Sequence, residues 1–245
     1  MPERPGRLGV GVIGAGRVGP VLAAALAGAG HAIVGVSAAS AESAERVEAM
    51  LPGVPLLSEP ELVRRAELVF LAVPDDQLPG LVSGLAETGG WQPGQLIAHT
   101  SASFGLAVLE PAAAAGAIGL ALHPLIAFTG TSLDLQRLTG AYIAVAAPAP
   151  VLPIAQALAV ELGGEPLVVA ERDRARFAEA VGAARTFSNA IVEQVTAGLA
   201  EIGVANPGRV IGPLMRSSVD NALAKTAGAD PELHGLGFID SSETP

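Results

Sequence analysis

The sequence predicts an α/β fold in which a doubly wound, mostly parallel sheet comes first and a smaller all-helical domain follows. Three observations predict this fold. The apolar run Val10–Ile13 leads into a glycine-rich turn and then into an alanine-rich segment. Strand-like and helix-like segments alternate over the first two thirds of the chain, as in right-handed βαβ units. From Arg172 to about Ile202 there is no proline, and apolar residues recur at helical spacing.

The first strand, turn and helix carry the most specific motif. The turn reads Gly14-Ala15-Gly16-Arg17-Val18-Gly19, which is G-x-G-x-x-G, and the helix expected over Val18–Ala29 is closed by Gly30. Gly14 permits the tight turn, Gly16 lets the backbone approach a pyrophosphate, and Gly19 lets the helix pack closely on the sheet. N–H groups at the helix N-terminus then face the phosphates. The motif predicts a dinucleotide site; the alternative is a glycine-rich turn of another α/β protein.

Other elements follow from capping residues and from apolar runs. Ser58-Glu59-Pro60-Glu61 is a helix start with acids in its first turn. Leu68–Val73 is uninterrupted and apolar, which is typical of a central parallel strand buried on both faces. The other expected strands are Ile33–Ser37, Leu96–His99, Ile118–Leu122, Ala141–Ala146 and Leu167–Ala170. The other expected helices are Ser43–Met50, Gln77–Leu85, Leu106–Ala115, Val151–Leu162, the long helix from Arg172 and, after the break at Asn206-Pro207, Pro207–Leu223.

The change of pattern at Glu171 places a domain boundary near residue 170. We expect residues 1–170 to form a dinucleotide-binding domain of the Rossmann type and residues 171–245 to form a helical domain for substrate binding and dimerisation. The tail from Gly228 to Pro245 shows no clear periodicity.

Composition excludes several function classes. The chain has 245 residues, a net charge of −10 and no basic cluster, which argues against nucleic acid and anionic membranes as partners. It has no cysteine, so disulfides, thiolate catalysis and cysteine metal sites are excluded. No uninterrupted apolar run reaches the roughly 18 residues of a membrane span, and Met1–Leu8 does not resemble a signal peptide. A cytoplasmic location is therefore expected.

The end of the second strand bears on the choice of cofactor. A protein that binds NAD usually places Asp or Glu there, where it bonds the ribose 2′-OH. This chain reads Val36-Ser37-Ala38-Ala39-Ser40 and offers no carboxylate that would repel a 2′-phosphate. Ser37 and Ser40 can donate hydrogen bonds, Arg17 can supply charge, and Arg46 is a weaker candidate. The strand end favours NADP, although the serines near residue 40 can equally serve as helix caps.

Three further strand ends are polar, on the side of the sheet where open α/β sheets bind ligands. Val73-Pro74-Asp75-Asp76 follows the central strand and is expected near the nicotinamide ribose, unless Asp76 caps the next helix. His99-Thr100-Ser101 and His123-Pro124 end the next two strands. A histidine at a strand end is more often structural than catalytic. No acidic cluster accompanies the two histidines, so a metal site is not expected.

These motifs together resemble the 6-phosphogluconate dehydrogenase-like superfamily, which includes ketopantoate and pyrroline-5-carboxylate reductases. More narrowly, Ile97–Ala102, Leu122–Leu125, Phe187-Ser188-Asn189 and Asp220–Leu223 resemble Rossmann-like proteins whose C-terminal half is the domain of unknown function 2520. The resemblance covers the chain up to about residue 225. It departs from the family at Ala102, where relatives have glycine, and after Asn221, where relatives continue with Leu-Thr-Gly-Pro; part of the helical domain is therefore expected to be missing.

The resemblance implies an NADPH-dependent reductase of a small 2-oxo acid or imine, and a homodimer formed through the helical domain. β-Hydroxyacid dehydrogenases carry Lys-x-x-x-Asn on the corresponding helix, and this chain has Arg185 and Asn189 at that spacing, on one helix face. Asn189 and Arg185 would hold the substrate, Ser101 would assist near the nicotinamide, and His123 would be the general acid. Two alternatives remain: a non-catalytic protein that binds or senses NADP, and a purely structural interaction protein.

Overall fold

The computed structural model describes residues 7–227, so the tail whose periodicity is unclear lies outside the described residues. The chain divides into two compact units, one ending at Gly182 and the other beginning at Ala183. The division falls inside helix α8 (Arg174–Glu201), later than the boundary expected near residue 170.

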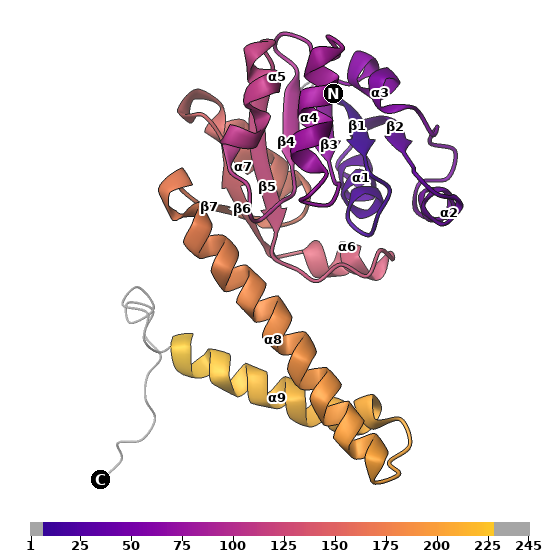
Figure 1. Ribbon diagram of the computed structural model, residues 1–245, viewed down its shortest axis with the longest axis vertical. Coiled ribbons are helices and arrows are strands. Elements are labelled where there is room, and N and C mark those ends of the chain that lie inside the picture. Colours follow the sequence, from indigo (N-terminus) through magenta and orange to yellow (C-terminus); the bar gives the residue numbers. More distant parts are fainter. Residues whose placement is uncertain (1–6, 228–245) are drawn as a thin grey trace, which may run out of the picture. The chain divides into compact units, whose positions relative to one another are not determined.

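Unit 1 contains a seven-stranded sheet in the order β2-β1-β3-β4-β5-β6-β7 (Figure 1). All neighbouring strands run parallel except β5 and β6. The order and the parallel pairing confirm the expected α/β fold. The strands are β1 Gly9–Ile13, β2 Ala32–Ser37, β3 Leu68–Leu71, β4 Leu96–His99, β5 Ile118–Pro124, β6 Tyr142–Ala146 and β7 Glu165–Val168.

Helices cover both faces of this sheet because successive strand residues point to opposite faces. On β3, Leu68 and Phe70 belong to one buried apolar cluster, while Val69 and Leu71 belong to another. The first cluster includes residues of α1 and α7, and the second includes residues of α3, α4 and α5. The helices of unit 1 are α1 Gly19–Gly28, α2 Ala41–Met50, α3 Glu59–Arg65, α4 Leu78–Glu87, α5 Glu110–Ala114, α6 Leu133–Leu138 and α7 Leu152–Glu161.

Local capping explains where several of these helices begin. Ser40 and Ser43 form a reciprocal capping box, so α2 starts slightly before the expected Ser43. Ser58 and Glu61 form a second capping box at the start of α3, where the sequence predicts a helix start. The helix expected over Leu106–Ala115 is divided: Leu106–Leu109 is a 3-10 turn and only α5 is α-helical.

The expected mostly parallel sheet is confirmed, and its antiparallel pairing lies at β6. Strand β6 pairs antiparallel with β5, with Pro124 opposite Ile143 and Ala121 opposite Ala146. The connection after β5 carries only the short helix α6, which the sequence analysis did not predict. Since β6 begins beside the carboxyl end of β5, the chain runs back along β5 without crossing to the other edge of the sheet.

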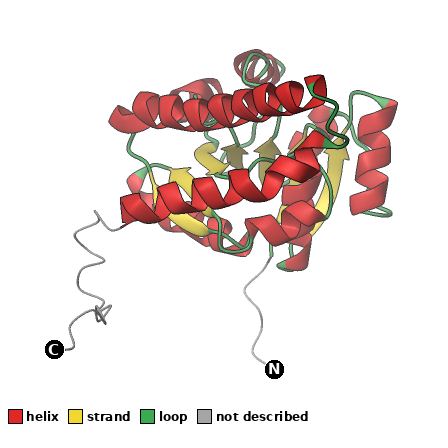
Figure 2. Cartoon of the chain, turned by 90° about the horizontal axis from the view of Figure 1, so that it is seen from below, coloured by secondary structure: helices red, strands yellow, loops and turns green. Residues whose placement is uncertain are grey.

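Unit 2 comprises the later part of α8 and helix α9 (Pro207–Ala227), both drawn as red helices in Figure 2. Both helices were expected, and so was the break between them, where Asn206 adopts a positive φ of 54° before Pro207. Within residues 7–227, no helix is sufficiently long and apolar to span a membrane.

The three glycines of the turn after β1 have different steric surroundings. Gly14 has φ +104°, and a Cβ there would lie 2.5 Å from the carbonyl oxygen of Ala72. A Cβ on Gly19 would overlap the carbonyl oxygen of Gly14, so α1 packs against the turn itself. A Cβ on Gly16 would meet no atom within 4 Å. The fold therefore requires the first and third glycines and does not require the second.

We predict that Gly14→Ala and Gly19→Ala destabilise the protein, whereas Gly16→Ala does not. Backbone strain and overlap at Gly14 correspond to about 1–3 kcal/mol, and a surface change such as Gly16→Ala stays within about 0.5 kcal/mol. Urea unfolding of the three variants measures the free energy of unfolding. A loss of stability in Gly16→Ala as large as in Gly14→Ala would contradict this account of the turn.

Candidate functional site

The carboxyl ends of four parallel strands meet at one edge of the sheet. Ile13 at the end of β1 pairs with Leu71, Leu71 pairs with His99, and His99 pairs with Ala121 of β5. The polar residues that follow these strands therefore lie along one edge, which is where open parallel sheets bind ligands. We treat this edge as the candidate functional site.

The turn after β1 has the features of an anion site. Gly16 and Arg17 are exposed, and Gly16 borders open space. Helix α1 begins after Val18 without a side-chain cap and without an acidic residue in its first turn. Its first N–H groups thus have no side-chain acceptor, while the helix dipole favours negative charge there. The fold does not require glycine at position 16, so the missing side chain there is explained by a ligand. The open space beside Gly16 would let a ligand phosphate approach the backbone closely.

Both serines at the end of β2 have structural partners. The Ser37 hydroxyl accepts a hydrogen bond of 3.1 Å from the Gly14 N–H, which ties the end of β2 to the turn. The Ser40 hydroxyl accepts the Ser43 N–H and caps α2, which confirms the capping alternative. The Ser40 hydroxyl also donates to Ser43 Oγ at 3.1 Å, whereas the Ser37 hydroxyl retains its donor for a ligand contact.

Arg46 supplies a cation directly beside the turn, although its place in the sequence makes it the weaker candidate. Its Nη1 donates to the Ala15 carbonyl oxygen at 2.9 Å, and its Nη2 donates to Glu42 at 2.7 Å. Arg17 lies on the turn itself with an exposed side chain. The i, i+4 spacing of Glu42 and Arg46 was visible in the sequence, but it gave no indication that α2 would bring Arg46 to the turn.

The loop between β5 and α6 packs against the turn from the other side. A Cβ on Gly130, which has φ +81°, would lie 3.1 Å from the Cα of Arg17. Asp134 is fully buried and accepts hydrogen bonds from Thr129 N–H at 2.7 Å and from Gly130 N–H at 2.8 Å. Burial raises the pKa of Asp134, but these hydrogen bonds outweigh it and hold the pKa below its usual value. The buried carboxylate thereby fixes the loop beside Arg17.

The segment after β3 also reaches the turn. Strand β3 ends at Leu71, earlier than the expected Val73, and the Val73 side chain lies 3.2 Å from the position of a Gly14 Cβ. Pro74 and Asp75 are exposed beyond it. Helix α4 has Gln77 as its N-cap, without a side-chain cap, so the alternative role of Asp76 as the cap is wrong.

The first of the two strand-end histidines is uncharged near neutral pH. His99 is fully buried, and its Nε2 lies 3.1 Å from the Gly105 carbonyl oxygen. Burial lowers the pKa of His99 to about 4, a shift that the bond to Gly105 only partly offsets. His99 is therefore neutral near pH 7 and is not an acid that gives up a proton there.

His123, at the end of β5, is half-buried and held in one orientation. Its Nδ1 lies 2.7 Å from the Thr100 carbonyl oxygen, and since a carbonyl only accepts, Nδ1–H is the donor. Its ring also meets Phe177 edge to face, with centroids 6.1 Å apart. Together these contacts fix the orientation of the imidazole ring at the carboxyl edge.

Ser101 has a defined structural role. Its Oγ accepts the N–H groups of Ser103 at 3.0 Å and Phe104 at 3.2 Å, so it stabilises the loop after β4. Only 7% of the residue is exposed. Its hydroxyl proton remains available to a ligand at the edge.

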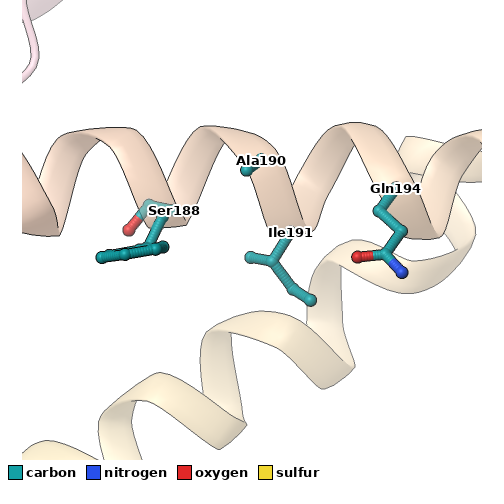
Figure 3. Close-up of a pocket in the computed structure, with 5 residues that line it drawn as sticks. Ser188, Ala190, Ile191 and Gln194 are labelled. Carbon is teal, nitrogen blue, oxygen red and sulfur yellow. The ribbon is translucent and has the colours of Figure 1, made fainter.

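Arg185 and Asn189 belong to unit 2 and are exposed on α8. Their spacing places them on one helix face, as expected. A hollow of about 410 Å³ lies beside α8 in unit 2, and Ile191 and Gln194 project from α8 toward the side of α9 (Figure 3). The hollow is lined by Phe187, Ser188, Ala190, Ile191 and Gln194.

Metal ligands do not gather at these positions. Within residues 7–227 the structure places no group of three or more His, Asp or Glu side chains that could hold a metal ion.

Solved structures share this fold at low sequence identity. The NADP-oxidoreductase candidate BF3122 of Bacteroides fragilis is 20% identical with a TM-score of 0.74, and the match covers 88% of this chain and 80% of that chain. An imine reductase from Pseudomonas sp. is 18% identical with a TM-score of 0.67, covering 91% and 77%. A Plasmodium falciparum pyrroline carboxylate reductase with NADP bound is 13% identical with a TM-score of 0.64, covering 98% and 86%. At these identities the likeness establishes the fold.

Sequence families give a more specific result. No protein with a curated description matches the chain. The profile of the Rossmann-like domain matches residues 2–124, and the profile of the domain of unknown function 2520 matches residues 141–230. The chain therefore belongs to the Rossmann-like domain family and carries the domain of unknown function 2520 as its later part.

Proposed function

We propose that the protein is an NADPH-dependent oxidoreductase that reduces a small 2-oxo acid or imine. The observation that carries the proposal is the open space at Gly16, beside an uncapped helix N-terminus and a strand end without a carboxylate. The names of the structural neighbours, an NADP-oxidoreductase candidate and an imine reductase among them, support the same class of reaction.

The nucleotide would be held along the turn and its neighbours. Backbone N–H groups of the turn and of the first turn of α1 would bind the pyrophosphate. Arg46 and Arg17, with Ser37 and Ser40, would bind the ribose 2′-phosphate, because these are the cations and hydroxyls beside the end of β2. Residues 73–75 would lie beside the nicotinamide ribose. When bound, NADPH supplies the hydride.

The chain would supply the proton and hold the substrate. His123 is the proposed general acid, since the Thr100 carbonyl oxygen orients its ring at the carboxyl edge and an imidazolium can give a proton to a carbonyl oxygen or imine nitrogen. His99 is excluded from that role by its low pKa. Ser101 would assist with its hydroxyl proton, and Asn189 and Arg185 on α8 would hold the substrate.

Unit 2 is proposed to form a homodimer. Large apolar side chains on its two helices are exposed, as they are at surfaces that associate. They include Phe187, Ile191, Val210, Leu214, Val219 and Leu223. The cytoplasmic location stays part of the proposal, and a chain without cysteine has no disulfide that would need an oxidising compartment.

The cofactor assignment predicts that NADPH raises the melting temperature more than NADH at equal concentration, because a ligand that binds only the folded state stabilises it by mass action. Arg46→Met should reduce the preference for NADPH about tenfold, as expected for loss of one charge-assisted contact of roughly 1.5–3 kcal/mol. Arg65→Met is the matched control, since Arg65 also pairs at i, i+4, with Glu61, but on α3. A larger shift with NADH would overturn the assignment.

The role of His123 predicts that His123→Ala lowers kcat/KM for NADPH-dependent reduction of ketopantoate or a cyclic imine by about 10²–10⁴-fold. The NADPH-induced rise in melting temperature should be unaffected, because His123 lies at the end of β5 and the turn follows β1. Unchanged turnover in His123→Ala would show that another group gives the proton. If wild-type protein binds NADPH but reduces no member of a panel of 2-oxo acids and imines, the alternative of a nucleotide-binding protein without catalysis is correct.

The dimer proposal predicts that Leu214→Asp shifts the protein toward monomer in sedimentation equilibrium at micromolar concentration, because a charge would be buried in the apolar surface. Leu133→Asp is the control, since Leu133 is similarly exposed but lies on α6 of unit 1. A wild-type protein that sediments as a monomer at all concentrations would contradict the proposal.

A further inference from the structure

Arg174 is a buried cation whose donors are unused. It opens α8 within unit 1, and only 4% of the residue is exposed. Its Nε, Nη1 and Nη2 are buried and have no hydrogen-bond partner in the part of the chain that the structure describes. Burial lowers the pKa of its guanidinium, an effect that nearby Glu171 opposes. Arginine nevertheless remains charged near neutral pH, because its normal pKa is so high.

Glu171, the acidic residue that acts electrostatically on Arg174, does not neutralise this charge by direct contact. Glu171 Oε1 accepts the Leu106 N–H at 3.1 Å, and its Oε2 lies beside Gly105, where a Cβ would overlap it. Across residues 7–227, no Asp or Glu forms an ion pair within 4.0 Å of Arg174. A buried charge without a partner is costly, so the arrangement is one that an external anion would stabilise.

The guanidinium lies in the same cluster as the two histidines. Its Cζ is 5.6 Å from the centroid of the Phe177 ring, and the His123 ring contacts that same ring. Arg174 also acts electrostatically on His99. Arg174 is therefore at the carboxyl edge near β4 and β5, next to the proposed general acid. Phe177, which is half-buried, provides an aromatic face for the cation in the absence of an anion.

We propose that Arg174 binds the carboxylate of an anionic substrate, so that the natural substrate is a 2-oxo acid or an imine carrying a carboxylate. This inference rests on the proposed reductase function and narrows its substrate class. The substrate carboxylate replaces Phe177 as the partner of the guanidinium. Two N–H groups of the guanidinium then donate hydrogen bonds to the two carboxylate oxygens. The carbonyl or imine carbon next to the carboxylate then lies near His123.

A substrate carboxylate fits this position better than a phosphate of the nucleotide. The turn that would hold the pyrophosphate follows β1, and β3 separates β1 from β4 in the sheet. Arg174 instead shares Phe177 with His123, which lies at the end of β5. The exposed Arg185 of unit 2 was the sequence-based candidate for a carboxylate, but its side chain carries no comparable unpaired buried charge.

The test uses the full-length protein saturated with NADP⁺ and two probes: oxamate, a non-reacting 2-oxo acid analogue, and its neutral ester ethyl oxamate. Oxamate should raise the melting temperature and ethyl oxamate should not, because only oxamate carries a carboxylate. Arg174→Met should weaken oxamate binding about tenfold to a hundredfold, as expected for the loss of a charge-assisted pair. It should leave the NADPH-induced shift intact. Arg176→Met is the control, since Arg176 is exposed on the same helix.

The outcomes separate this inference from the proposed function. If NADPH produces no shift in wild-type protein, the proposed function fails. If NADPH stabilises the protein but oxamate binds Arg174→Met as well as wild type, the inference about Arg174 is wrong. If Arg174→Met instead loses the NADPH shift, its anion is a nucleotide phosphate, and the carboxylate assignment is overturned. A purely structural Arg174 would lower the melting temperature in Arg174→Met, whereas removing an unpaired buried charge should not.

Discussion

Close approach of backbone to backbone at the turn after β1 is the constraint on which the site depends. Gly19 has no side chain, so α1 starts directly against the carbonyl oxygen of Gly14, and Gly14 lies against Ala72. This contact aims the N-terminus of α1 at the carboxyl edge of the sheet. The Ser37 hydroxyl, the Arg46 guanidinium and the loop fixed by Asp134 then pack around the same turn. Gly14 and Gly19 therefore hold the turn in the position where these three groups contact it.

The same edge brings together groups with different electrostatic properties. His99 is neutral because burial lowers its pKa, while His123 is oriented by a backbone carbonyl and is only half-buried. Arg174 adds a positive charge sheltered beside Phe177. A proton donor next to an unpaired cation suits a substrate whose reacting carbon adjoins an anionic group. The opposite end of the site, at Gly16, suits phosphates.

Local sequence was sufficient for the order of the strands, the glycine turn and the helix start at Ser58, because each depends on residues that are neighbours in the chain; β3 ends two residues earlier than expected, and β7 spans Glu165–Val168 instead of Leu167–Ala170. It failed where long-range packing decides. The antiparallel β6 and the short helix α6 follow from how the chain returns along β5, and no periodicity marks that return. Arg46 and Arg174 are ordinary helix residues in sequence; only the fold brings one to the turn and buries the other. Asp76 was a plausible cap by composition, yet Gln77 is the N-cap of α4 and no side chain caps the helix.

Hydrogen exchange with and without NADPH tests most directly whether the carboxyl edge is the nucleotide site. We expect slower exchange at the amides of Gly14–Gly19 and of residues 37–46 when NADPH is bound. Exchange in α5 should not change, because α5 packs in the apolar cluster that does not include α1. Protection confined to segments outside this edge, or no protection at a concentration that saturates binding, would contradict it.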